Sequence, residues 1–322
     1  MRVLLTGGAG FIGSHVLDRL VQDHEVTILD RLDTSGNLNR LAKYKGDHRV
    51  HFFYHDLRAA ISDYLAGQLG AGFDYILHLG AATHVDRSIE TPMEFVQDNV
   101  VATCNILDYA RLAGCRRFLY FSTDEVFGPA PHGVRYKEWD RYRSGNPYAA
   151  TKAGAEELTI SYQNTYGLPA FITHTMNVIG TCQHPEKFVP STIRKVRDGE
   201  TVTIHADKTK TVAGSRFYIG AESVADAVMF LLDKAEPGEK YNIVGERELD
   251  NLSLAKLIAG FVGKPLKYEM TDFHSSRPGH DLRYALDGEK MKKLGWEPPN
   301  TIEKTLEKAV AWYLRNPGWL GK

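Results

Sequence analysis

The chain has 322 residues, and its 39 Lys and Arg side chains nearly balance its 40 Asp and Glu, for a formal net charge of −1. Such neutrality argues against a protein that binds nucleic acid or an anionic membrane surface, and 43% hydrophobic residues argue against disorder. The three cysteines, Cys104, Cys115 and Cys182, are too scattered for a disulfide framework or a zinc site. We therefore expect no metal and a reducing, cytoplasmic location. No apolar run approaches the roughly 18 residues of a membrane span.

Short apolar segments alternate with longer amphipathic segments over the first 180 residues. Strands are predicted at Arg2–Thr6, Glu25–Asp30, Val50–Tyr54, Tyr75–Leu79 and Phe118–Ser122, and helices at Phe11–Gln22 and Thr91–Leu112. This alternation is typical of βαβ units, which place helices on both faces of a parallel sheet. The predicted fold is therefore an α/β doubly wound, Rossmann-like sheet.

The alternation weakens after about Gly180, where prolines become frequent. The length also favours two parts at about 150 residues per domain. We predict a dinucleotide-binding domain over residues 1–180. Residues 181–322 are predicted to form a smaller, mixed substrate-binding region, some segments of which return to the sheet.

A glycine-rich loop follows the first predicted strand and opens the first helix. Its Gly7, Gly10 and Gly13 permit a tight turn and close approach of a pyrophosphate, and the helix start at Phe11 and Ile12 offers free N–H groups to it. Asp30 ends the second strand, where a carboxylate can bind the ribose hydroxyls and repel a 2′-phosphate. The predicted cofactor is NAD rather than NADP, although Arg31 leaves this choice open. Asp56 and Leu57 follow the third strand and are candidate contacts to the adenine edge.

Tyr148 and Lys152 are four residues apart, and so lie on one face of a predicted helix. A Lys ammonium one turn from a Tyr can lower the phenol pKa towards neutral pH and make it a usable base. Ser122 or Thr123, at the end of the fifth strand, is a candidate to orient a substrate hydroxyl. Together with the glycine loop, this pair is typical of the short-chain dehydrogenase/reductase proteins.

Asp124 and Glu125 follow Thr123 directly. Hydride transfer does not need two carboxyl groups beside a nicotinamide. Elimination of water does, because one group removes a proton from carbon and the other delivers a proton to the departing hydroxyl. The alternative is that both side chains are a solvated loop pair.

The chain resembles the nucleotide-sugar 4,6-dehydratases of the extended short-chain dehydrogenase class almost end to end, most of all the branch acting on dTDP-glucose. The segments that carry the resemblance are the glycine loop, residues 35–38, 82–88, 123–128, 146–152, 165–169, 184–187 and 277–287. The Thr-Asp-Glu triplet and the Arg-Pro-Gly-His-Asp segment at 277–281 are specific to this branch.

The resemblance implies a lyase with tightly bound NAD that converts a nucleotide-linked hexose into a 4-keto-6-deoxy sugar. Tyr148, supported by Lys152 and Thr123, removes the O4 proton while NAD oxidises C4. Glu125 then removes the C5 proton, Asp124 protonates the leaving C6 hydroxyl, and the reduced cofactor returns hydride to C6.

The resemblance also implies how the substrate and a second subunit are held. The positions that hold the nucleotide diphosphate in the family are matched here by Asn177, Lys187, Arg216 and Arg277. His84 and Asp86 are candidates to line the sugar site, the alternative being a structural role for both. A homodimer is expected through the helices near 91–112 and 147–166.

The sequence departs from the family pattern at Val178 and Ile179, at Phe217 and Tyr218, and in a shorter segment after Gly128. These changes leave open a UDP- or GDP-linked sugar and a 5,6-ene product. The remaining alternatives are a nucleotide-sugar 4-epimerase or decarboxylase, against which Asp124 and Glu125 argue, and a non-catalytic NAD-sensing protein.

Overall fold

The computed structural model describes residues 1–33, 35–272 and 282–321. Its centre is a seven-stranded sheet with the strand order β11-β6-β5-β4-β1-β2-β3, in which every neighbouring pair is parallel. The strands are β1 (Arg2–Thr6), β2 (Glu25–Asp30), β3 (Val50–Tyr54), β4 (Phe73–His78), β5 (Cys115–Thr123), β6 (Ala170–Thr175) and β11 (Lys240–Ile243). The predicted doubly wound α/β fold is confirmed.

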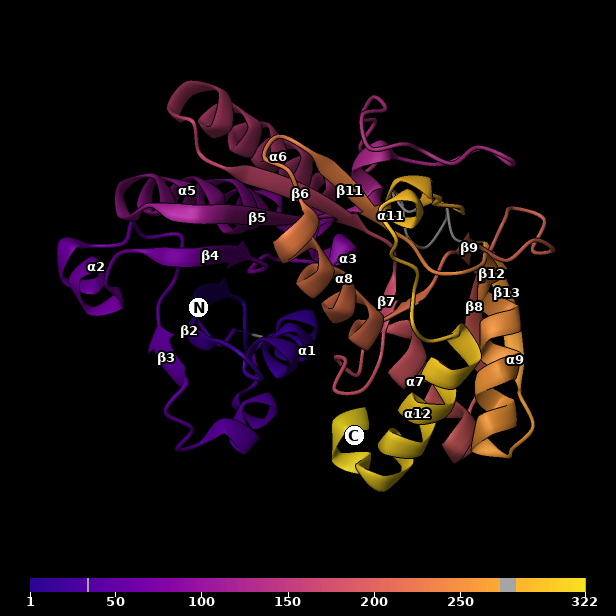
Figure 1. The fold of residues 1–322 in the computed structure, drawn as a ribbon. Helices are drawn as coiled ribbons and strands as arrows, with labels where there is room; N and C mark the ends of the chain where they lie inside the picture. The colour runs from indigo at the N-terminus through magenta and orange to yellow at the C-terminus, as the bar shows by residue number, and fades with distance from the viewer. Residues whose placement is uncertain (34, 273–281, 322) are drawn as a thin grey trace.

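Two strands are longer or shifted relative to the prediction, and two, β6 and β11, were not predicted. β4 begins at Phe73, and β5 begins at Cys115 because it includes the charged Arg116 and Arg117, which an apolar run does not reveal. β11 lies beside β6 in parallel register, so the sheet takes its edge strand from well beyond residue 180. Figure 1 shows β11 next to β6.

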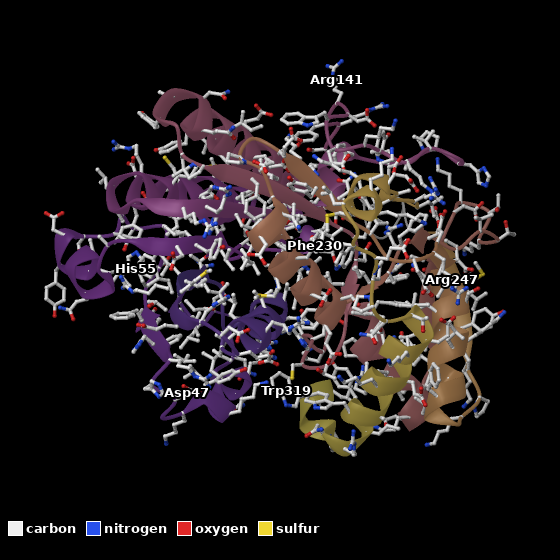
Figure 2. The ribbon with its side chains drawn as sticks, viewed as in Figure 1. Asp47, His55, Arg141, Phe230, Arg247 and Trp319 are labelled. Atoms are coloured by element: carbon white, nitrogen blue, oxygen red, sulfur yellow. The ribbon has the colours of Figure 1, made fainter. Side chains whose placement is uncertain are left out.

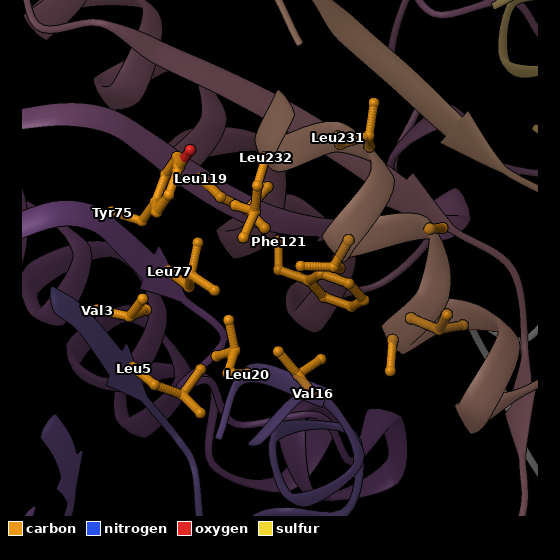
Figure 3. Close-up of a cluster of buried hydrophobic side chains, with 14 of the residues drawn as sticks. Val3, Leu5, Val16, Leu20, Tyr75, Leu77, Leu119, Phe121, Leu231 and Leu232 are labelled. Carbon is orange, nitrogen blue, oxygen red and sulfur yellow. The ribbon is translucent and has the colours of Figure 1, made fainter. Parts of the chain in front are cut away.

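Helices cover the sheet on both faces (Figure 1). The α-helices of the described residues are α1 (Phe11–Leu20), α2 (Asp63–Leu69), α3 (Val85–Glu90), α4 (Pro92–Phe95), α5 (Ala102–Ala113), α6 (Pro147–Tyr166), α7 (Phe188–Asp198), α8 (Ala221–Lys234), α9 (Asn251–Val262), α11 (Glu289–Lys293) and α12 (Ile302–Arg315). On one face, α1 and α8 pack against each other and the sheet through a cluster that includes Val16, Leu77, Phe121 and Leu231 (Figure 3). On the other face, α2, α5 and α6 bury a second cluster against β4 and β5.

The predicted helix over Thr91–Leu112 is not one regular helix. α4 leads into wider π-helical turns over Val96–Val101, and these continue into α5. Asn99 lies within the π-helical turns and is buried at 1% exposure. Such turns often occur at functional sites, and this one turns a polar side chain inward where apolar periodicity predicts none.

The C-terminal part packs around α7, α9 and α12, which share a separate hydrophobic cluster. Small two-stranded sheets accompany it: β7 (Val178–Ile179) with β10 (Ile219–Gly220), β9 (Ser215–Arg216) with β12 (Leu249–Asp250), and β8 (Val202–Ala206) with β13 (Tyr268–Asp272). Trp319 lies beside the N-terminal part of the chain in Figure 2, with the Arg40 guanidinium 5.3 Å from its ring centre. This contact ties the C-terminal turn to the segment after β2.

Two kinds of feature are absent from the described residues. None of the helices found there has both the length and the apolar character that crossing a membrane requires. Among the same residues, no three His, Cys, Asp or Glu side chains are grouped as a metal site would need.

Candidate active site

A crevice opens where β1 and β4 end side by side. The chain leaves β1 towards β2 and β3 and returns on the other side as β4, so this is the point at which the strand order reverses. Ligands of open α/β sheets bind at such a point. Gly7, with a φ of +72°, and Gly80 form its floor, and a Cβ added to Gly7 would lie 2.8 Å from the Gly80 Cα atom. Only glycine lets the two loops approach this closely.

The glycine loop itself is packed as a cradle for a ligand. A Cβ on Gly13 would lie 2.1 Å from the Gly7 carbonyl oxygen, and one on Gly10 would lie 3.0 Å from it. Gly10 is also the N-cap of α1, and no side chain caps that helix start. The N–H groups of the first turn therefore remain available to an anion such as a pyrophosphate.

The crevice continues into an open cleft with about 1050 Å³ of empty space. Asp30 lies in this cleft, where its carboxylate accepts hydrogen bonds from the Ala9 N–H at 3.0 Å and the Leu32 N–H at 2.8 Å. The predicted cofactor residues that line the cleft are Gly7, Gly10, Phe11, Ile12, Gly13, Asp30, Asp56 and Leu57. The loop, the helix start and the carboxylate thus form one continuous surface that fits a dinucleotide.

The guanidinium of Arg31 is surrounded by carboxylates. Its guanidinium donates to Asp98 at 2.5 and 2.7 Å and to Asp33 at 2.7 Å, and it lies 3.5 Å from Asp56. The negative charge of these groups raises the pKa of Arg31 above its ordinary value, hydrogen bonding by Asp98 being the largest cause. An arginine already neutralised by carboxylates is poorly suited to a 2′-phosphate, so the ambiguity left by the sequence is reduced in favour of NAD.

Tyr148 and Lys152 lie on the inner face of α6, which begins where the Asn146 side chain accepts a hydrogen bond from the Ala149 N–H. Both are buried, with 7% and 4% of their surface exposed. The Lys152 ammonium donates to the Phe121 carbonyl oxygen at 2.7 Å. Burial raises the pKa of Tyr148, the charge of Glu125 adds to the rise, and hydrogen bonding with Thr123 opposes it. This is the opposite of the lowered pKa that the sequence predicts, and burial is its largest cause.

The Thr-Asp-Glu triplet turns at the end of β5 and separates its two carboxyl groups. The Thr123 hydroxyl donates to the Asp124 carboxyl at 3.0 Å and accepts from the Glu125 N–H at 3.3 Å. Asp124 is 4% exposed, and burial, with the charge of Glu125, raises its pKa to about 7. Glu125 is half-buried and accepts a hydrogen bond from the Asn146 amide at 3.0 Å. The pKa of Asp124 is therefore close to neutral pH, whereas Glu125 lies in a more polar environment.

Two asparagines join this site that the sequence did not single out for a role. The Asn146 amide donates a hydrogen bond to the Glu125 carboxylate. The sequence feature that could have identified Asn146 is an Asn directly before a Pro at the start of a helix. Asn99 bonds the backbone of Ala82, which lines the cleft, and donates to the Thr151 hydroxyl of α6 at 2.9 Å. It links the cleft wall to the helix that carries Tyr148 and Lys152.

The five predicted catalytic residues do not line the cleft itself; they stand beside it at the end of β5 and the start of α6. Of the predicted substrate residues that the structure describes, only Lys187 lines the cleft, at the start of α7. The His84 ring lies 3.6 Å from the Glu186 carboxylate, and the buried side-chain oxygen of Asn177 has no hydrogen-bond partner among the described residues.

Arg216 lies near Asp124, and its positive charge lowers the pKa of Asp124. Its guanidinium donates to the Ser215 and Leu282 carbonyl oxygens, both at 2.7 Å, and stacks 4.5 Å from the Tyr284 ring centre. Arg277 lies outside the described residues.

The sheet, the glycine cradle with Asp30, and the Tyr–Lys pair on α6 define the class: an enzyme of the extended short-chain dehydrogenase/reductase type. A family model described as GDP-mannose 4,6 dehydratase matches residues 4–309. The chain belongs to this family of nucleotide-sugar 4,6-dehydratases.

Individual relatives agree with this assignment. The dTDP-glucose 4,6-dehydratase of Escherichia coli is 35% identical, over 99% of this chain and 95% of that protein. The crystal structure of DesIV, the dTDP-glucose 4,6-dehydratase of Streptomyces venezuelae with NAD and TYD bound, superposes with a TM-score of 0.91 at 36% identity and covers 100% and 99% of the two chains.

A longer plant relative also matches. The Arabidopsis thaliana trifunctional UDP-glucose 4,6-dehydratase/UDP-4-keto-6-deoxy-D-glucose 3,5-epimerase/UDP-4-keto-L-rhamnose-reductase RHM1 is 38% identical over 99% of this chain, which spans 48% of the length of that protein. The chain thus spans about half the length of this relative.

Proposed function

We propose that the protein is an NAD-dependent 4,6-dehydratase that converts a nucleotide-linked hexose into its 4-keto-6-deoxy derivative, with dTDP-glucose as the substrate. The support is the family, the glycine cradle that fits a dinucleotide, and the triplet at the end of β5. NAD, when bound, supplies the oxidation of C4 and the later reduction of C6. Everything else in the reaction is positioning and proton transfer by the chain's own residues.

The single observation that carries the proposal is the contrast between Asp124 and Glu125. A buried carboxyl with its pKa raised to about 7 keeps a proton to give to a departing hydroxyl. The adjacent Glu125, held by Asn146, is available as the base that removes the C5 proton. An enzyme that only oxidises and re-reduces C4, as an epimerase does, has no use for this pair.

The remaining residues divide the other steps. Tyr148 takes the O4 proton, with Thr123 bonded to its phenol and Lys152 supplying positive charge one helical turn away. Asp30 and the N–H groups at the start of α1 hold NAD. We assign the nucleotide diphosphate to Asn177, Lys187, Arg216 and Arg277, and the sugar side to His84.

The choice of dTDP over UDP or GDP rests on the dTDP-glucose 4,6-dehydratases among the relatives. It is tested by incubating purified protein with each of the three nucleotide hexoses, without added cofactor, and measuring product masses. We expect the dTDP-sugar to lose one water and give a 4-keto product fastest. A faster reaction with the UDP-sugar would reassign the nucleotide, and a mass-neutral epimer would overturn the reaction itself.

We also propose a homodimer and a cytoplasmic location. α5 and α6 pack together, and large apolar side chains at their ends are exposed: Leu112 at 74% and Tyr166 at 55%. A second copy packing on this face would bury them in a four-helix interface. The cytoplasm supplies NAD and nucleotide sugars, and its reducing conditions suit the three free cysteines.

A further inference from the structure

A buried carboxylate lies directly behind the proposed catalytic lysine. Glu156 is one helical turn beyond Lys152 on α6, on the same face of the helix, and none of its surface is exposed. A glutamate four residues after a lysine on a helix is ordinarily a solvated partner on the outer surface. Here the helix turns it into the protein, so a function for its charge must be sought among the groups it meets.

Four elements converge on this carboxylate. One of its oxygens accepts a hydrogen bond from the Ser122 hydroxyl of β5 at 2.5 Å. The other accepts from the Tyr142 hydroxyl, in the loop before α6, and lies 3.1 Å from His174 Nε2 of β6 and 3.4 Å from Lys240 Nζ of β11. Figure 1 shows α6 lying along the part of the sheet formed by β5, β6 and β11.

The cluster is balanced to keep Glu156 ionised. Burial opposes the charge, but His174, Lys240 and the Ser122 hydroxyl outweigh it and lower the pKa of Glu156 to about 2. Lys240, 4% exposed, also donates to the Tyr142 hydroxyl at 2.5 Å. A buried anion with a full set of partners is stable, whereas removal of one partner is costly.

This anion acts on the active site by two routes. Burial lowers the pKa of Lys152 to about 7, and the charge of Glu156 is what opposes that fall. In addition, Lys152 and Glu156 hold successive residues of β5, because Lys152 donates to the Phe121 carbonyl oxygen while Glu156 accepts from Ser122. The next three residues are Thr123, Asp124 and Glu125.

We infer that Glu156 is a positioning residue: it keeps the Lys152 ammonium charged beside Tyr148 and fixes the end of β5 that carries the Thr-Asp-Glu triplet. The inference rests on the proposed function, since it assigns Lys152 and the triplet to the same reaction. The residues that face Glu156 and carry charge or titrate are Lys152, Tyr120, Tyr142, His174 and Lys240.

The first test is the pH profile of substrate-dependent reduction of bound NAD in a single turnover. In Glu156→Gln, Lys152 loses its proton at lower pH and no longer favours ionised Tyr148. The rate of NAD reduction at neutral pH should fall about tenfold. The pH midpoint at which the rate increases towards alkaline pH, which follows ionisation of Tyr148, should rise by about one pH unit. Glu157→Gln, which neutralises the exposed neighbour on the same helix, should match the wild type. A folded Glu156→Gln enzyme with an unmoved profile would overturn the inference.

The second test needs no turnover. An NMR titration of isotope-labelled lysine, with Lys152→Met to assign the signal, should show Lys152 deprotonating at lower pH in Glu156→Gln than in wild type. Equal midpoints would contradict the inference even if the enzyme acted on no sugar at all. Should Glu156→Gln fail to fold because Lys240 is left unpaired, the double variant Glu156→Gln/Lys240→Met removes both charges and carries the same expectation.

Ser122→Ala separates the two routes, because it deletes one hydrogen bond and leaves the buried charges in place. We expect a several-fold slower single turnover with an unshifted pH midpoint. If the Ser122→Ala enzyme is as fast as the wild type at every pH, the proposed role of Glu156 in fixing the end of β5 is wrong. If the wild-type protein reduces its bound NAD with none of the sugar nucleotides, the proposed function fails instead, and the titration of Lys152 still decides the role of Glu156.

Discussion

Asp124 and Glu125 are chemically similar neighbours that the fold treats differently. Asp124 is buried against Thr123 and has an oxygen with no hydrogen-bond partner among the described residues, whereas Glu125 turns towards Asn146 in a more open position. A difference of environment between two carboxyl groups is a physical basis for dividing acid from base. The sequence places the two groups together, but the burial that separates them is a tertiary property.

Glu125→Gln tests the base. Gln keeps the size of the side chain but cannot accept the C5 proton, so exchange of that proton with solvent should be lost. Reduction of bound NAD in a single turnover should survive, because Tyr148 and Lys152 are untouched. Both are measurable on one sample, by mass for the exchange and by absorbance for the NADH. Loss of both in a folded protein would remove Glu125 from its assigned role.

Asp124→Asn tests the acid through stability. Because the folded pKa of Asp124 is raised to about 7 from 3.8, the folded state binds more protons than the unfolded state between these values, and stability falls as pH rises through this window. The variant should lose dehydration yet be more stable than wild type at pH 8, by on the order of 4 kcal/mol. Denaturant unfolding at pH 8 and pH 4 measures this, and the gain should vanish at pH 4. An equal gain at both values would mean that the carboxyl is not held protonated.

Single residues also show what periodicity and motifs leave out. The sequence could not decide whether Arg31 binds a phosphate, because its partner Asp98 is 67 residues away. It could not reveal Glu156, whose four partners come from β5, β6, β11 and a loop. Contacts of this kind arise only when distant strands become neighbours.

At the scale of elements, the glycine loop was predictable because its spacing reflects a local need. Gly7, Gly10 and Gly13 leave no room for a Cβ, and the loop, its strand and its helix are contiguous in the chain. The π-helical turns at Val96–Val101 and the strands β6 and β11 were missed. The π-helical turns interrupt the apolar periodicity on which the helix prediction depends. β11 has only four residues and begins with the charged Lys240.

Gly13→Ala tests the loop. Its Cβ would lie 2.1 Å from the Gly7 carbonyl oxygen, so the backbone must move and the cradle must open. Purified variant should retain much less NAD than wild type, measured by release on denaturation. Gly67→Ala in α2 is the matched control, because its Cβ meets nothing within 4 Å, and it should retain NAD and gain about 0.5–1 kcal/mol in stability. Full retention by Gly13→Ala would show that the loop does not hold the cofactor.

At the scale of the whole molecule, the near-zero net charge argued against nucleic acids and anionic membranes as binding partners and gave little other information about function. Charge is arranged locally instead, in an uncapped helix start, in Arg31 neutralised by its carboxylates, and in Arg216 beside Asp124. The fold class followed from the order of elements, because βαβ units are local and their handedness is fixed. The roles of the site residues remain predictions, since geometry brings the groups together without showing the reaction.

Leu112→Glu tests the assembly. A charge at this exposed position of α5 would have to be buried in the proposed four-helix interface, so the variant should sediment as a monomer while wild type sediments as a dimer. Tyr64→Glu, at an 80% exposed site on α2, should leave the dimer intact. A monomeric wild type would exclude the interface outright.

The central claim is that one bound cofactor oxidises C4 and then reduces C6 of the same sugar, with a dehydration between the two steps. Nucleotide-linked glucose carrying deuterium at C4 tests this most directly, with the product analysed by mass spectrometry and NMR. The account predicts a 4-keto-6-deoxy sugar that has lost one water and carries the deuterium at C6. A product with the deuterium back at C4 and no loss of water would contradict it, and so would a 5,6-ene that never gains the deuterium.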